Sequence, residues 1–144
     1  IEQKIAEKFI GLTRKDNLIS SVSVNTETFA LTLMSKEGDV LAPSRLSAGE
    51  RQLLAIAILS ALAEASGKEL PTVIDTPLGR LDGRHRSKLI DNYFPKAASQ
   101  VLLLSTDEEI TGKYYTALKP FINREYHIAF DEQGKTSTIS EGYF

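Results

Sequence analysis

The segment RLSAGERQLLAIAILSALAEASGKELPTVIDTPLGRLD, residues 45–82, constrains the fold more than any other part of the chain. It joins a long apolar helix pattern, residues 47–65, to a short strand pattern, TVID at 72–75. Gly67 ends the helix pattern and Pro71 restarts the chain, because neither residue suits a helix interior. A helix that is apolar on all sides is typical of a buried position, so we expect this one to lie in the core.

A second strand pattern, QVLLLS at 100–105, is apolar without alternation. This is typical of a central parallel strand that is covered on both faces. Helix patterns run from about Gly83 to Phe94 and from about Asp107 to Leu118. The order helix, strand, helix, strand predicts an α/β fold with parallel central strands.

The two ends of the chain carry different patterns. Apolar residues spaced for one helix face predict the tail of an amphipathic or coiled-coil helix, with Ile1, Ile5, Phe9 and Leu12 on that face. Residues 18–24 and 27–34 alternate with period two, and a turn at 36–39 follows, which predicts half-buried antiparallel strands. Residues 126–140 predict a closing β-hairpin.

The composition limits the class of protein. A chain of 144 residues that is 42% hydrophobic fits one globular domain. Its 17 basic and 19 acidic residues exclude a surface built mainly to neutralise DNA phosphates, but leave room for a local basic patch. The absence of cysteine excludes disulfides and thiolate metal sites, and the longest apolar run, 53–63, is too short for a membrane span. We therefore expect a cytoplasmic protein. Because residue 1 falls inside a helix pattern and is not Met, we also expect a piece of a longer chain.

A phosphate-binding loop is the first motif to test, and residues 129–136, AFDEQGKT, fit its loose pattern. A true loop cradles phosphate with backbone N–H groups and leads into a helix. Here Asp131 and Glu132 would repel phosphate, and the sequence that follows is typical of a strand. We interpret the segment as the hairpin turn, with Gly134 supplying a positive φ.

The start of the long helix allows two interpretations. Ser47 and Glu50 have the spacing of a capping box. That pattern does not explain Gly49, because glycine inside a helix costs about 1 kcal/mol relative to alanine. A glycine lets another group approach the backbone closely, and a helix N-terminus attracts anions. A γ-phosphate would suit this position.

Three further positions carry chemistry that can equally be structural. Asp75 ends a strand pattern, where a carboxylate can ligate Mg²⁺ or simply turn the chain. Asp82 has the position of an N-cap, and Thr106 with Glu109 has the spacing of a second capping box. The two histidines, His85 and His127, are too far apart in sequence to indicate a zinc site.

Together, LSAGERQ (46–52), TVIDTPLGRLD (72–82) and VLLLSTDEEI (101–110) resemble the C-terminal lobe of an ABC-type ATPase of the SMC and DNA-repair group. The resemblance implies the C-terminal half of a P-loop ABC-type head, with parallel central strands, helices and antiparallel hairpins. It implies that Asp75 is the Walker B aspartate and a metal ligand, and that Leu81-Asp82 is the D-loop. The signature motif would be Ser47, Ala48, Gly49 and Glu50, and the switch region Ser105, Thr106 and Asp107.

The same resemblance implies a domain plan and partners. Residues 1–12 would end a returning coiled-coil arm, and residues 13–144 would form the lobe. The phosphate loop would belong to an N-terminal lobe of the same protein. ATP and Mg²⁺ would bind in the full-length protein, where the signature motif contacts the nucleotide of a second head, in an ATP-dependent homodimer on DNA.

Within this group, RLSAGERQLLAIA, VIDTPLGRLD, LLSTDEEI and the closing EGYF resemble the DndD family of bacterial DNA phosphorothioation. Those systems replace a non-bridging backbone oxygen of DNA by sulfur. The resemblance covers nearly the whole chain from Leu18 onward. It implies that the other phosphorothioation subunits are partners.

Three departures from the ABC pattern bear on hydrolysis. Ala48 replaces the first signature glycine, Thr76 replaces the catalytic glutamate and Thr106 replaces the switch histidine. We expect a slow Mg²⁺-dependent ATPase in which Thr76 and Thr106 position water or phosphate, and Asp82 is the nearest carboxylate across the dimer. The fragment alone should be inactive. The alternative is a non-hydrolysing dimerisation scaffold or DNA clamp. A third idea, an independent nucleotide-binding protein, conflicts with the missing phosphate loop.

Overall fold

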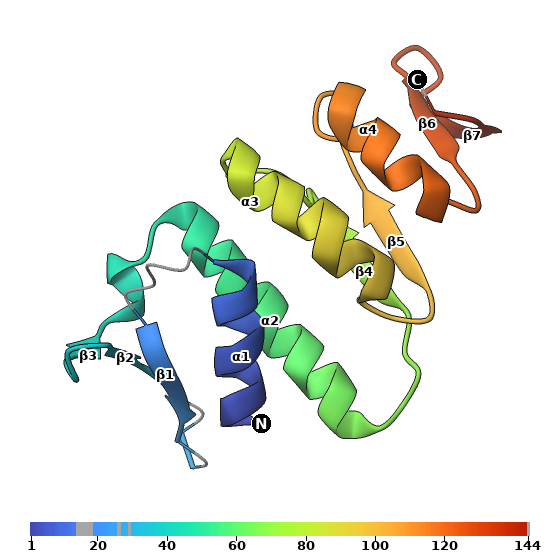
Figure 1. Cartoon of the computed structure of the whole chain (residues 1–144). Coiled ribbons are helices and arrows are strands. Elements are labelled where there is room, and N and C mark those ends of the chain that lie inside the picture. Colours follow the sequence, from blue (N-terminus) through green and yellow to red (C-terminus); the bar gives the residue numbers. More distant parts are fainter. Residues whose placement is uncertain (14–18, 26, 29, 144) are drawn as a thin grey trace.

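The computed structural model describes residues 1–13, 19–25, 27–28 and 30–143 (Figure 1). Leu18 and Phe29, which the sequence places in strands, and Phe144 of the closing motif lie outside these residues. No helix within the described ranges has the length and apolar character needed to cross a membrane.

The N-terminal part pairs a helix with a small sheet. Helix α1 (Glu2–Leu12) lies along α2 (Ala48–Ser66) and against β1 (Ile19–Val24), as Figure 1 shows. Strands β1, β2 (Leu31–Ser35) and β3 (Val40–Leu41) form an antiparallel sheet in that order. The amphipathic helix and the antiparallel strands are therefore confirmed, with the buried face of α1 formed by Ile5, Ala6, Phe9 and Leu12.

Strand β2 begins later than the alternation predicts. The Asn25 side-chain oxygen accepts hydrogen bonds from the backbone N–H groups of Glu27 (2.9 Å) and Thr28 (2.8 Å). This turn uses the N–H groups that a strand would offer to its neighbour. The predicted strand at 27–34 is therefore shortened at its start, and pairing begins with Val24 opposite Leu31.

Helix α2 is only half buried, which corrects the prediction of a core helix. It begins at Ser47 and ends at Gly67, whose φ of 64° makes the left-handed cap that glycine allows. One side packs in the core through Leu53, Leu54, Ile56, Ala57 and Ala61. The opposite side leaves Leu59 66% and Leu62 45% exposed. The described chain supplies partners for one side of this helix alone.

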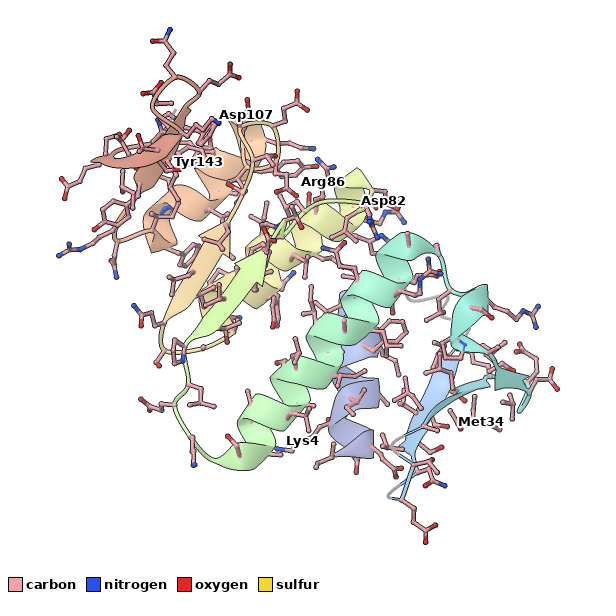
Figure 2. The ribbon with its side chains drawn as sticks, turned by 180° about the vertical axis from the view of Figure 1, so that it is seen from behind. Lys4, Met34, Asp82, Arg86, Asp107 and Tyr143 are labelled. Atoms are coloured by element: carbon pink, nitrogen blue, oxygen red, sulfur yellow. The ribbon has the colours of Figure 1, made fainter. Side chains whose placement is uncertain are left out.

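Strands β4 (Thr72–Asp75) and β5 (Val101–Leu104) pair in parallel, as predicted, from Thr72 opposite Val101 to Asp75 opposite Leu104. The prediction that this sheet is covered on both faces is wrong. Ile74 and Leu103 pack against the core, whereas Val73 is 59% exposed on the other face. Helix α3 (Gly83–Lys88) and its continuation lie in front of the pair in Figure 1, and no helix lies in front of it in the reverse view of Figure 2.

The helix predicted at 83–94 is present with a changing pitch. A π-helical turn (Leu89–Tyr93) and a 3₁₀ turn (Phe94–Lys96) follow α3. The helix predicted from Asp107 begins later: α4 spans Gly112–Leu118, and residues 107–109 form a turn. Glu109 points into the interior instead of capping a helix, and the chain enters α4 through Gly112 with a φ of 52°.

The closing hairpin is confirmed, with β6 (Tyr126–Asp131) paired to β7 (Thr136–Glu141). Residues 129–136 therefore lie in its strands and turn. The predicted positive φ at Gly134 is wrong, because Lys135 has that conformation, with a φ of 48°. Gly134 instead leaves room for the Asp131 side chain in its present position. The Asp131 carboxylate accepts its N–H at 3.1 Å, and a Cβ at this position would lie 2.6 Å from that carboxylate.

Candidate functional site

A hollow of about 600 Å³ lies between the start of α2 and the end of β4. The Gln52 side-chain amide donates a hydrogen bond to the Thr76 carbonyl (3.2 Å) and so links the two elements. The hollow brings three of the predicted site residues together, because its lining consists of Ala48, Arg51, Gln52, Asp75, Thr76, Gly79 and Arg80. It is the part of the described chain where the helix N-terminus and the strand-end carboxylate meet.

The start of α2 is a complete capping box. The Ser47 hydroxyl accepts from the Glu50 N–H (3.2 Å), and the Glu50 carboxylate accepts from the Ser47 N–H (2.8 Å). Gly49 has an explanation within the chain. A Cβ at this position would lie 2.9 Å from the Arg80 carbonyl oxygen and 3.3 Å from the Leu81 side chain. The close approach that the glycine allows is therefore made by the chain's own backbone.

The segment that follows β4 carries backbone strain. Thr76 has a φ of 45° and Arg80 a φ of 59°, both in the left-handed region. This region is unfavourable for a β-branched residue and costs on the order of 1–3 kcal/mol. The Thr76 N–H donates to the Leu104 carbonyl at 2.9 Å, which holds the strained residue against β5. Such strain is concentrated at functional sites in proteins.

Asp75 is the last residue of β4 and is exposed on the uncovered face of the strand pair. No group of three or more His, Cys, Asp or Glu side chains in the described part of the chain could hold a metal ion. Magnesium commonly uses one or two protein carboxylates and takes its other ligands from substrate phosphates and water. Asp75 fits that partial role, and the described residues do not form a complete metal site.

Asp82 is the N-cap of α3, which confirms the structural interpretation. Its Oδ1 atom accepts from the N–H groups of Arg84 (3.0 Å) and His85 (2.9 Å), and the His85 ring nitrogen Nδ1 lies 3.1 Å away. It is labelled in Figure 2 at the start of α3. Asp82 does not line the hollow, so the structure does not bring its carboxylate to Asp75 and Thr76.

The predicted switch residues follow β5. Thr106 is exposed, and the Ser105 hydroxyl shares a 2.9 Å hydrogen bond with the Tyr143 hydroxyl. The Tyr143 ring, labelled in Figure 2, stacks on Tyr115 with centroids 5.2 Å apart. The sequence gives no signal for this contact between the chain's end and the switch.

Glu109 connects the switch to the segment after β4. Its Oε1 atom accepts from the Leu78 N–H (3.2 Å) and its Oε2 atom from the Thr106 N–H (3.3 Å). The predicted second capping box is therefore only half present, because the Glu109 N–H bonds the Thr106 carbonyl and no helix begins there. The spacing of Thr106 and Glu109 was the available signal, and it predicted a cap.

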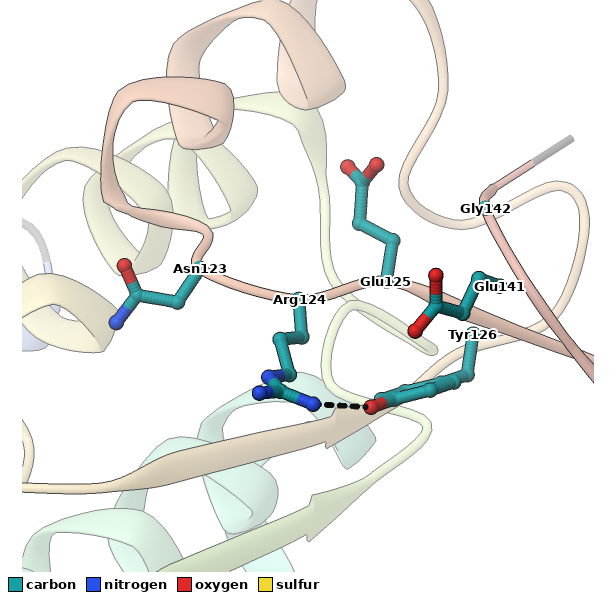
Figure 3. Close-up of a pocket in the computed structure, with 6 residues that line it drawn as sticks. All are labelled: Asn123, Arg124, Glu125, Tyr126, Glu141 and Gly142. Atoms are coloured by element: carbon teal, nitrogen blue, oxygen red, sulfur yellow. Dashed lines mark hydrogen bonds between the residues drawn. The ribbon is translucent and has the colours of Figure 1, made fainter.

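A second hollow of about 310 Å³ lies beside the hairpin, at residues 123–126, 141 and 142 (Figure 3). The Arg124 guanidinium donates to the Tyr126 hydroxyl at 3.2 Å, a contact that raises the pKa of Arg124. Nearby, Lys119 and the Tyr115 hydroxyl lower the pKa of Glu125. None of the predicted site residues lines this hollow.

No protein-family model matches the chain. The chain is 28% identical over 122 residues to the DNA double-strand break repair Rad50 ATPase of Halobacterium salinarum, a match that covers 78% of this chain and 14% of that protein. The chain therefore spans about a seventh of this relative's length.

Solved structures with a similar fold include two from SMC proteins. One comes from work on ATP-driven dimerisation and DNA-stimulated activation of SMC ATPases (TM-score 0.63, 15% identity, 99% of this chain and 83% of that chain). The other is the Smc head domain of Pyrococcus yayanosii with a coiled coil and joint (TM-score 0.65, 17% identity, 97% of this chain and 26% of that chain). The chain has the fold of the C-terminal lobe of an SMC/Rad50-type ABC ATPase head.

Proposed function

We propose that this chain is the C-terminal half of an ATP-binding head in an SMC/Rad50-like protein. Residues 1–12 end a coiled-coil arm, and residues 13–144 form the lobe. The observation that carries the proposal is the shared hollow, where the α2 N-terminus and Asp75 meet. A strand-end carboxylate favours Mg²⁺ and a helix N-terminus favours phosphate, so Asp75 suits the Mg²⁺–nucleotide of its own head and the α2 N-terminus suits the phosphate of a nucleotide on a second head.

An N-terminal lobe of the same protein is the first partner. The uncovered faces support it, because Val73, Leu102 and Leu104 on the strand pair and Leu59 and Leu62 on α2 are all exposed. Exposed apolar side chains grouped in this way mark a surface that is covered by protein. The phosphate loop belongs to this lobe, since residues 129–136 form a hairpin.

The signature residues act on the nucleotide of a second head, in an ATP-dependent homodimer. The Ser47 hydroxyl accepts the Glu50 N–H, which leaves its own hydrogen free to donate to a γ-phosphate oxygen. Gly49 lets the Arg80 backbone pack against the first turn of α2, and Ala48 lines the hollow beside it. Asp75 ligates Mg²⁺, directly or through water, and the bound ion neutralises phosphate charge.

Hydrolysis in the full-length protein is slow. A threonine hydroxyl can orient water but is too weak a base to take its proton, so Thr76 and Thr106 act as positioners. Phosphoryl transfer tolerates this, because its loose transition state depends mainly on alignment and electrostatics. We expect turnover below about 1 s⁻¹, against ~1–10³ s⁻¹ for typical enzymes. Asp82, exposed although it caps α3, contributes its charge across the dimer.

The biological process is bacterial DNA phosphorothioation, in the cytoplasm, with DNA and the other phosphorothioation subunits as partners. The motif strings of the DndD family support this finer assignment. The test is complementation of a strain that lacks the full-length protein, with phosphorothioate linkages measured by mass spectrometry. Wild type should restore the linkages and Asp75→Asn should not. Normal modification without the protein would remove the phosphorothioation role and leave the ATPase proposal standing.

A non-hydrolysing dimerisation scaffold or DNA clamp is the second candidate. It is favoured by Thr76, which provides neither a carboxylate nor relaxed backbone geometry where a base would act. Steady-state ATPase assays of full-length wild type and Thr76→Val separate the two candidates. Slow wild-type turnover that falls in Thr76→Val supports the enzyme. No turnover in wild type supports the scaffold, and equal turnover in the two proteins means that the Thr76 hydroxyl has no catalytic part.

The nucleotide site is tested at Ser47. In the full-length protein, Ser47→Arg places a bulky cation at the α2 N-terminus and should prevent dimerisation driven by a slowly hydrolysed ATP analogue. Binding of the analogue by the phosphate loop should persist. Ser44→Arg, at an exposed position three residues earlier, is the matched control. Light scattering gives the dimer fraction, and unchanged dimerisation in Ser47→Arg would reduce the segment to a helix cap.

A further inference from the structure

The parallel ladder between β4 and β5 ends at the site. Its last bond runs from the Thr76 N–H to the Leu104 carbonyl (2.9 Å). Beyond this point β4 continues into the segment that leads to Asp82, and β5 continues into the switch. The Glu109 carboxylate joins the two segments again, since one oxygen takes the Leu78 N–H and the other takes the Thr106 N–H.

This link is buried and tightly packed. Glu109 is 8% exposed, and Leu78 beside it is fully buried. A Cβ at Gly79 would lie 3.3 Å from the Glu109 Oε1 atom, so the backbone passes close to the carboxylate. No lysine, arginine or histidine forms an ion pair with Glu109 among the residues that the structure describes. Its burial is compensated by the two backbone N–H groups.

A carboxylate is the side chain that this geometry requires. Both of its oxygens are acceptors, so it can hold two donors from two segments at once. A glutamine of nearly the same shape has one acceptor oxygen and one donor amide. The amide would face a backbone N–H and release one of the two segments.

We propose that Glu109 is a positioning residue for nucleotide hydrolysis, which holds the switch residue Thr106 in register with the Asp75–Asp82 segment. This rests on the proposed ATPase function. The carboxylate is buried and does not line the hollow at Asp75 and Thr76. It acts through two backbone amides, one on each side of the site, so that a shift of one segment is transmitted to the other.

The test compares full-length wild type, Glu109→Gln and the control Glu108→Gln, an exposed neighbour that changes charge equally. Misplacement of aligned groups by about 1 Å costs up to about 100-fold in rate, so we expect kcat of Glu109→Gln to fall about 10- to 100-fold. The KM for ATP and the analogue-driven dimer fraction should stay within about twofold. Glu108→Gln should match wild type.

Amide hydrogen exchange of the same proteins supplies a readout that does not depend on turnover. Exchange should become faster in Glu109→Gln around residues 76–79 and 104–106, and stay unchanged in the long helix α2. Wild-type kcat with unchanged exchange in Glu109→Gln would overturn the proposal, as would loss of ATP binding, which indicates a merely structural role. A third outcome is faster exchange in Glu109→Gln together with no ATP hydrolysis by wild type. It would overturn both the ATPase function and the positioning role, and leave only the structural link.

Discussion

Two segments of the molecule share one pattern, a hydroxyl residue followed three positions later by glutamate, and they fold differently. Ser47 and Glu50 exchange hydrogen bonds across the first turn of α2. Thr106 and Glu109 make only one of these contacts, and the second carboxylate oxygen of Glu109 binds the Leu78 N–H, 31 residues away in sequence.

The difference lies in what each glutamate meets. Glu50 lies in the first turn of a helix of 19 residues whose first N–H groups need acceptors, so the local pattern decides its contacts. Glu109 meets a buried amide from a neighbouring segment, so the tertiary fold decides its contacts. A local pattern therefore specifies a cap only where a helix follows and no competing buried donor is near.

The largest difference in stability should appear when each glutamate is replaced by alanine. Glu109→Ala leaves the buried Leu78 N–H and the part-buried Thr106 N–H without their acceptor, and loss of the acceptor of a buried amide costs about 1–3 kcal/mol, so we expect about 2 kcal/mol. Glu50→Ala at the partly exposed helix start should cost no more than about 1 kcal/mol. Urea unfolding of both variants measures the two costs. Equal costs would remove the distinction between cap and buried link.

Gly49 and Gly11 sharpen the comparison between a packed and an open helix position. A Cβ at Gly49 would lie 2.9 Å from the Arg80 carbonyl oxygen, whereas nothing lies within 4 Å of a Cβ at Gly11. Relieving the first contact should cost more than the ~1 kcal/mol gained in helix propensity, for a net loss of about 1–2 kcal/mol in Gly49→Ala. Gly11→Ala should stabilise by up to about 1 kcal/mol. Chemical denaturation measures the free energy of unfolding of both variants. An equal increase in the two would show that Arg80 moves aside easily.

The hydroxyl residues of the two patterns should differ by a smaller amount. Ser47→Ala removes a capping hydrogen bond and should cost about 1 kcal/mol. Thr106→Ala removes a hydroxyl that caps no helix at an exposed position, so its cost should stay within about 0.5 kcal/mol. Thermal unfolding of the pair checks this order, and a reversal would indicate that Thr106 makes the stronger cap.

The smallest effect belongs to a third glutamate, Glu64, on the surface of α2. Lys4 and Lys8 of α1 hold its pKa at about 2, below the ordinary 4.5. A lowered pKa means that the contribution to stability is fully present above about pH 4.5 and is lost as the pH falls towards 2. Wild type and Glu64→Gln should therefore unfold at urea concentrations that converge over this range. Because these side chains are largely exposed, the difference above it should be small. A pH-independent difference would exclude the ion pairs as its cause.

Much of the fold could be predicted from the sequence, because the hydrophobic period of an element and the residues that end it are local features. The parallel pairing of TVID with VLLL, the capped start of α2 and the glycine at its end all follow from short-range patterns. The start of β2 could not, since it depends on the Asn25 side chain competing for backbone N–H groups. The prediction of how deeply α2 and β4 are buried was also wrong, because burial depends on what covers an element.

The candidate site was predictable in its positions and less so in its contacts. Asp75 at a strand end, Ser47 at a helix start and Asp82 at an N-cap follow from residue type and place. The approach of Arg80 to Gly49 and the bond from the Leu78 N–H to Glu109 each join segments about 30 residues apart, so no local pattern contains them. Tyr143 reaches Ser105 from the far end of the chain for the same reason.

The uncovered face of β4 and β5 has a practical consequence for anyone who expresses this chain by itself. The face exposes apolar side chains, those of Val73, Leu102 and Leu104, on a molecule whose net charge at pH 7 is only −2. Such a weakly charged particle has little colloidal repulsion to keep copies apart. We expect concentration-dependent self-association during purification, relieved by co-expression with the proposed N-terminal lobe.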